Sequence, residues 1–167
     1  MKYATAAMLI ATTAHAQAPQ EPPADHSGTY FCKATAAGGL SYDKNLKAWS
    51  STTFDVADSS YTVKVTSTDK FGGDQYGLKS RSYNITVKKF GSQEKPSNCF
   101  SLTRGESGNE VVTFGDRVEC RFFGTQYLFN FASNRYLVQF EGGFVWGDEE
   151  KNADTPYIEG GKCDKIN

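Results

Sequence analysis

The sequence predicts an all-β domain of about eight to ten short antiparallel strands. Apolar and polar residues alternate with period two, turn-forming residues separate the alternating runs, and no segment keeps a convincing helical period. One apolar and one polar face per strand is typical of antiparallel sheets that are packed on one side. We therefore expect either an antiparallel barrel or a two-layer sandwich.

The alternating runs place Tyr, Val, Ile, Cys and Phe on one face and polar or charged residues on the other. The clearest runs are 61–66, 82–88, 117–122, 127–131 and 135–141, and shorter strands are expected at 39–42, 46–49 and 111–114. Turn residues lie between them, as at 43–45, 72–73, 115–116 and 133–134. A short helix over 75–79 is the one weak helical signal.

The beginning of the chain has the layout of a secretory signal. Lys2 precedes a short run of small and apolar residues, 4–14, which ends in Ala14-His15-Ala16. The run is shorter than a membrane-spanning helix requires. We expect cleavage near Ala16 and export to the periplasm or the medium, without stable membrane insertion.

Three segments follow from this prediction: a signal peptide (1–16), a flexible proline-rich tether (17–27) and a single domain (28–167). The whole chain carries 18 basic and 19 acidic side chains. The net charge of the chain is therefore −1, which is too small to give a global attraction to nucleic acid or anionic lipid. Lys88, Lys89 and Lys95 are interpreted as a solvated edge, and we expect a monomer that binds no nucleic acid.

The four cysteines predict two disulfides, because exported proteins pass through an oxidising environment. Three pairings are open, and we favour Cys32–Cys163 and Cys99–Cys120. The first would join the opening strand to the final strand, and the second would close a local loop. No Cys-x-x-Cys pair and no nearby histidine support a zinc site, so we expect neither metal nor cofactor.

Catalytic chemistry has little support in the sequence. After cleavage the one histidine left is His26, which lies in the expected tether and is interpreted as solvated. Paired carboxylates could serve glycoside hydrolysis, and Glu119, Glu141 and Glu159 are the candidates, although ordinary surface positions are the simpler interpretation. The acidic stretch 148–154 does not match a calcium-binding loop and is interpreted as a hairpin tip.

Aromatic residues make up 14% of the chain, and most of them belong to the apolar strand faces. Trp49 and Trp146 border polar turn regions, and Tyr42 lies in the strand that precedes Trp49. Rigid aromatic surfaces near loops suit sugar or protein partners. These three residues are the candidate binding residues, with core packing as the alternative for each tryptophan.

Two terminal signatures carry a resemblance. The first is Gly28-Thr29-Tyr30-Phe31-Cys32 with Ala37-Gly38-Gly39-Leu40-Ser41-Tyr42-Asp43, and the second is the segment 154–163, DTPYIEGGKC. Together they resemble a loose group of small exported bacterial proteins that have no assigned function. The architecture is also similar to lipocalin-like barrels, although the Gly-x-Trp motif of that family is absent. Neither resemblance supplies catalytic residues.

These observations predict an exported, non-catalytic binding protein of the cell envelope. Its ligand would be a protein, a glycan or a small apolar molecule. The alternatives are a hydrolase that uses carboxylates and a structural envelope protein without a discrete ligand.

Overall fold

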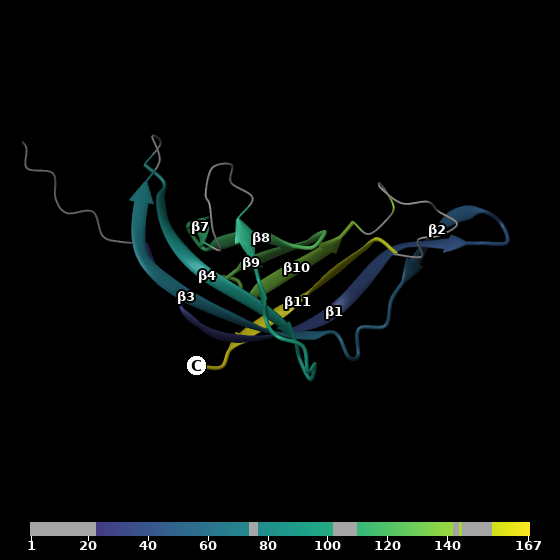
Figure 1. Ribbon diagram of the computed structural model, residues 1–167, viewed down its shortest axis with the longest axis horizontal. Helices are drawn as coiled ribbons and strands as arrows, with labels where there is room; N and C mark the ends of the chain where they lie inside the picture. The colour runs from purple at the N-terminus through teal and green to yellow at the C-terminus, as the bar shows by residue number, and fades with distance from the viewer. Residues whose placement is uncertain (1–22, 74–76, 102–109, 142–143, 145–154) are drawn as a thin grey trace, which may run out of the picture.

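The computed structural model describes residues 23–73, 77–101, 110–141, 144 and 155–167. This part of the chain is all-β and antiparallel, as the sequence predicts (Figure 1). Its strands are β1 (Gly28–Asp43), β2 (Ala48–Thr53), β3 (Ser60–Gly73), β4 (Lys79–Lys89), β5 (Ser97–Asn98), β6 (Phe100–Ser101), β7 (Glu110–Phe114), β8 (Arg117–Phe122), β9 (Thr125–Asn130), β10 (Arg135–Phe140) and β11 (Tyr157–Lys165).

The strands form where side chains alternate between an apolar interior and solvent. In β3, Val63 and Val65 are buried while Lys64 between them is exposed. The same period of two places Val118 and Cys120 of β8 inward and Arg117 outward. The inward residues of all the long strands meet in one hydrophobic core.

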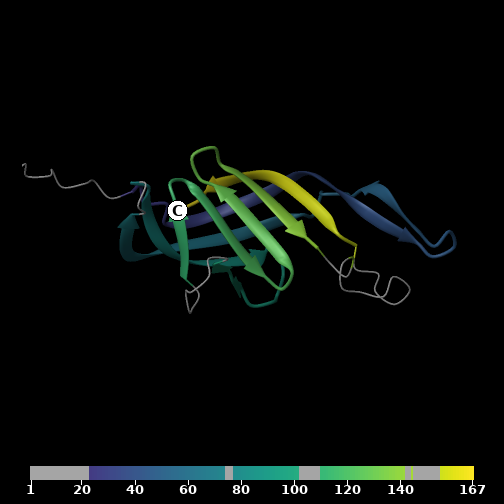
Figure 2. The same ribbon diagram turned by 90° about the horizontal axis from the view of Figure 1, so that it is seen from above.

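The sheet order is β11-β10-β9-β8-β7-β4-β3-β1-β2, and β11 also pairs with β1. The first and last long strands are thus neighbours, as predicted. β7 and β8 share one Cα pair, Phe114 with Arg117, next to their turn. The sheet therefore curls round without closing into the barrel that was one of the two expected architectures. The strands β8, β9 and β10 lie over β1 and β3, which is consistent with the other, a two-layer sandwich (Figures 1 and 2).

Both favoured disulfides are present. Cys32 lies directly opposite Cys163 in the β1–β11 ladder, and the two are bonded. Cys99 lies between β5, which pairs with β4, and β6, which pairs with β8, and it is bonded to Cys120 of β8. Each disulfide therefore ties together two parts of the curled sheet, and the pair indicates an oxidising, extracytoplasmic compartment.

The short helix expected over 75–79 is absent from the described residues of that segment, 77–79, so this prediction was wrong there. Gly77 and Leu78 are not helical and Lys79 begins β4, while residues 75 and 76 lie outside the described residues. Ladder pairing with β3, at Gly73 with Lys79, outweighs the local helical preference. No helix of the described chain is long and apolar enough to cross a membrane.

The segment 23–27 lies against the domain, whereas the sequence suggested a flexible tether there. The buried Arg81 donates to the Pro23 carbonyl at 3.1 Å and pairs with Asp25 at 2.9 Å. The Tyr83 hydroxyl donates to the Ala24 carbonyl at 3.2 Å. Composition alone does not reveal that inward-facing polar groups of β4 need these backbone partners.

His26 was also expected to be solvated, and that interpretation was wrong. Its side chain is 15% exposed, and its Nε2 lies 2.9 Å from Asp116 Oδ1. Its ring stacks on Phe131 with 5.0 Å between centroids. His26 therefore attaches the N-terminal segment to the β7–β8 turn and to the end of β9.

Candidate binding site beside the β1–β2 hairpin

β1 and β2 form a hairpin that extends away from the other strands (Figure 1). Its turn forms where the sequence predicts it, at Asp43. One side-chain oxygen of Asp43 accepts hydrogen bonds from the backbone N–H groups of Asn45 at 2.8 Å and Leu46 at 3.0 Å. This local side-chain bonding replaces backbone partners in the turn and fixes the register of the two strands.

That register brings the candidate residues Tyr42 and Trp49 together. They are directly opposite in the ladder, and their ring centroids are 5.2 Å apart. Phe144 extends this pair, because its ring lies edge-on to Trp49 with 5.0 Å between centroids. Three aromatic side chains from two distant parts of the sequence thus form one cluster on the hairpin.

A groove of about 310 Å³ lies at the base of the hairpin. Its lining is mostly apolar and comes from β1, from the end of β10, from Phe144 and from the start of β11. The lining residues are Gly38, Gly39, Leu40, Gln139, Phe140, Glu141, Phe144, Pro156, Tyr157 and Ile158. Phe144 belongs both to the groove and to the aromatic cluster, so the two features form one continuous site.

Gly39 permits the close approach of β1 and β11 at the floor of this groove. A Cβ atom at Gly39 would lie 2.1 Å from the Pro156 carbonyl oxygen, which is far inside contact distance. The neighbouring Leu40 N–H donates to the same carbonyl at 3.1 Å. A larger residue at position 39 would force the two strands apart and open the floor of the groove.

Tyr157 of the groove also contacts a buried polar cluster around Glu159. Glu159 is 4% exposed and accepts hydrogen bonds from the hydroxyl groups of Ser59 and Tyr136, the latter at 3.0 Å. Burial and then the charge of Glu159 raise the pKa values of Tyr136, Tyr61 and Tyr157. These tyrosines therefore keep their protons, and Tyr136 is held as a donor to the carboxylate.

The three candidate carboxylates do not converge. Glu159 points into the core, whereas Glu119 lies on the outer face, since its neighbours on both sides point inward. Glu119 lies 3.6 Å from Arg117, and Glu141 lies 3.7 Å from Arg121 at the groove. Each outer carboxylate thus has a basic neighbour on the surface, and the described residues contain no cluster that could hold a metal ion.

Sequence reasoning identified Tyr42 and Trp49 but missed Phe140 and Phe144. Phe140 belongs to the alternating run 135–141, which the sequence alone assigns to a strand face, whereas Phe144 lies beyond that run and no pattern marks it. Trp146 and the acidic stretch 148–154 lie outside the described residues.

No protein family, no curated protein and no solved structure matches this chain.

Proposed function

We propose that this chain is an exported, non-catalytic binding protein of the cell envelope and that the groove beside the β1–β2 hairpin is its binding site. The observation that carries the proposal is the junction of an apolar groove with the cluster of Tyr42, Trp49 and Phe144. Such concave, mostly apolar sites with a few polar groups at the edge are typical of small-molecule binding.

The ligand that this lining favours is a small apolar molecule. A volume of about 310 Å³ is at the lower end of ligand-binding clefts. Its polar groups are Gln139, near the end of β10, and Glu141, directly after β10. The separation of Glu159 from Glu119 and Glu141 favours binding over hydrolysis by paired carboxylates. A signal peptide cleaved near Ala16 would deliver the protein to the periplasm or the medium, where its two disulfides form.

A neutral fluorescent probe tests this proposal. N-phenyl-1-naphthylamine is titrated into the full mature protein, and its fluorescence is expected to rise and saturate. Leu40→Glu places a charge in the groove, so we expect at least a tenfold weaker dissociation constant. The matched control is Leu46→Glu, because Leu46 is 76% exposed on the same hairpin and does not line the groove.

The control is expected to bind the probe as the wild type does. Absence of saturable binding to the wild type, or equal losses in the two variants, would contradict the proposed site.

A further inference from the structure

A row of hydrogen-bond donors crosses the outer face of five neighbouring strands. The ladders place its members directly opposite one another from strand to strand, and all of them are exposed. Their neighbours along each strand point into the core, so these side chains point to solvent. The row consists of Arg117 (β8), Asn130 (β9), Arg135 (β10), Lys162 (β11) and Lys33 (β1).

Three cations are adjacent within this row. Lys162 pairs with Arg135 on one side and with Lys33 on the other. Like charges directly opposite on neighbouring strands repel each other and destabilise the sheet. Among the described residues none of the three forms an ion pair, whereas Arg117 lies 3.6 Å from Glu119. Within the described part of the chain no carboxylate balances these three charges, and an anionic partner would neutralise them.

Asn130 adds a donor to the row rather than an acceptor. Its side-chain oxygen already accepts hydrogen bonds from the backbone and the hydroxyl of Ser133, at 2.9 and 3.0 Å. The amide nitrogen is therefore the group that Asn130 offers to a ligand.

The acidic residue of the outer face of β11 that lies nearest the row is Asp164. It lies two residues after Lys162, opposite Phe31.

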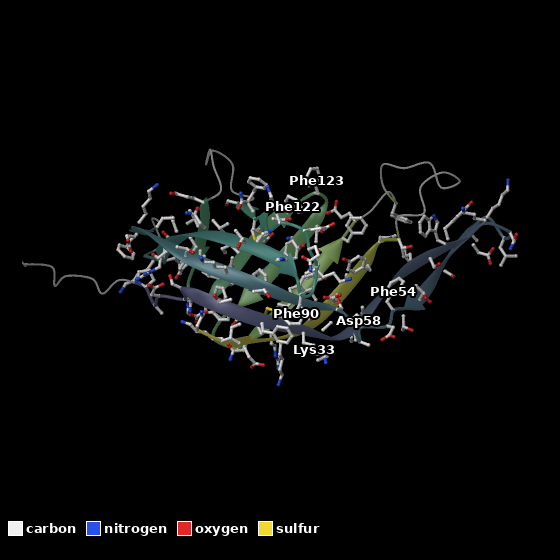
Figure 3. All side chains as sticks on the ribbon, turned by 60° about the horizontal axis from the view of Figure 1, so that its bottom comes forward. Lys33, Phe54, Asp58, Phe90, Phe122 and Phe123 are labelled. Atoms are coloured by element: carbon white, nitrogen blue, oxygen red, sulfur yellow. A yellow bond between two sulfur atoms is a disulfide. The ribbon has the colours of Figure 1, made fainter. Side chains whose placement is uncertain are left out.

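Hollows lie at both ends of the row, one mainly apolar and the other with a mixed polar and apolar lining. One, of about 280 Å³, is lined by Arg117, Asn130 and Arg135 together with Leu128 and Leu137. The other, of about 640 Å³, is lined by Lys33, Lys89, Asp58 and Ser60 together with Phe31 and Phe90. Lys33, Asp58 and Phe90 lie near one another there (Figure 3).

Phe90 offers a flat apolar surface beside the last cation of the row. It is 60% exposed, and its ring is held edge-on against Phe31 with 5.1 Å between centroids. An aromatic ring fixed in this way suits the apolar face of a sugar, while Ser60 and Asn130 can bond to hydroxyl or carboxylate groups.

From these observations we infer that the outer face of β8–β11 and β1 binds an acidic polysaccharide through this row. Four strand spacings give the row a length of roughly 19 Å, which suits a linear polymer rather than a single ion. The strands curl, so a flexible chain can follow the row where a flat bilayer would touch few of its members (Figure 2). Single-stranded nucleic acid would need a stacking surface for successive bases, and the row itself contains no aromatic residue.

Binding of polygalacturonate, a linear carboxylated polysaccharide, tests the inference, with neutral dextran as the comparison. The full mature protein is expected to bind polygalacturonate, more weakly as salt rises, and not to bind dextran. The double variant Lys33→Gln with Lys162→Gln is expected to bind at least tenfold more weakly. Its melting temperature should equal or slightly exceed that of the wild type, because repulsion within the row is relieved.

The matched control is Lys44→Gln with Lys95→Gln, which removes the same charge from exposed positions outside the row. It should bind polygalacturonate as the wild type does. Absence of binding by the wild type, or an equal loss in the control, would overturn the inference. Tighter binding of oligo(dT) or of phosphatidylglycerol vesicles through Lys33 and Lys162 would also overturn it, in favour of that other partner.

The Leu40→Glu variant separates this inference from the proposed function. It alters the groove beside the hairpin and leaves the row intact, so its affinity for polygalacturonate should be unchanged. A loss of polygalacturonate binding in this variant would contradict a separate site on the outer face.

Discussion

The two halves of β1 face different environments although they belong to one continuous strand. The first half pairs with β3 on one edge and β11 on the other, and its residues Tyr30, Cys32 and Ala34 are buried. The second half reaches out with β2 as the hairpin, where Tyr42 is half-buried and β2 is the last strand of the sheet.

This difference separates stability from recognition. The disulfide, the core and the buried hydrogen bonds all act on the first half of β1, whereas the groove and the aromatic cluster lie along the second. Changes in the first half of β1 and the core around it should therefore alter the free energy of unfolding. Changes in the hairpin should alter ligand binding with little effect on folding.

The largest effect is expected from the Cys32–Cys163 disulfide. It closes a loop of 131 residues, against 21 for Cys99–Cys120. Loop-closure entropy alone predicts a loss of about 5 kcal/mol for the first and about 3 kcal/mol for the second. Urea unfolding of the variant Cys32→Ala with Cys163→Ala, and of the variant Cys99→Ala with Cys120→Ala, measures both losses.

Reductant should lower the stability of the wild type as well. Equal losses of stability in the two double variants would contradict the prediction that the Cys32–Cys163 disulfide, which joins β1 to β11, stabilises the fold more than Cys99–Cys120 does.

An intermediate effect is expected from alkaline pH, through the tyrosines around Glu159. Burial, followed by the charges of Tyr157 and Glu159, raises the pKa of Tyr127 to about 12. Below about pH 10 the folded and unfolded states both hold this proton, so the contribution of Tyr127 to the free energy of unfolding is fully present. Between about pH 10 and about pH 12 the unfolded chain loses the proton first, and stability falls by about 1.4 kcal/mol per pH unit for each such tyrosine.

Urea unfolding at pH 8, 10 and 11 measures this loss, and the absorbance change of tyrosinate reports the titration itself. In Tyr127→Phe the slope between pH 10 and 11 should be smaller than in the wild type. A free energy of unfolding that stays constant from pH 8 to pH 11 would show that the tyrosines are solvated.

The smallest change in stability is expected at the hairpin. Trp49→Ala removes a ring that contacts Tyr42 and Phe144 but lies outside the core, so we expect less than about 1 kcal/mol. Phe129→Ala, in the core, should cost about 3–5 kcal/mol by the same measurement.

Probe binding should show the opposite order, with the larger loss in Trp49→Ala. Equal destabilisation by Trp49→Ala and Phe129→Ala would mean that the hairpin is part of the core.

Most of the strand positions could be predicted because each one depends on local alternation. The runs 61–66, 117–122 and 135–141 all fall within β3, β8 and β10 or extend one residue beyond them. Asp43 could likewise be assigned to a turn, since its side chain bonds to residues two and three positions ahead. The cysteine count and the expected neighbourhood of the first and last strands were enough to favour the observed disulfides.

The candidate site could be predicted only in part. Tyr42 and Trp49 are close in sequence and were found together, but Phe144 joins them from nearly a hundred residues away. His26 and Arg81 show the same limit, since their partners Asp116 and Asp25 are distant along the chain.

The sequence by itself determined the all-β class, the turn at Asp43 and the number of available cross-links, because these depend on side chains a few positions apart. The tertiary structure decided that Arg135, Lys162 and Lys33 stand in one row, that Glu159 is enclosed by tyrosines and that a groove lies beside the hairpin. The physical reason is strand register, which aligns distant residues and is set by the shared core and the disulfides rather than by any one strand.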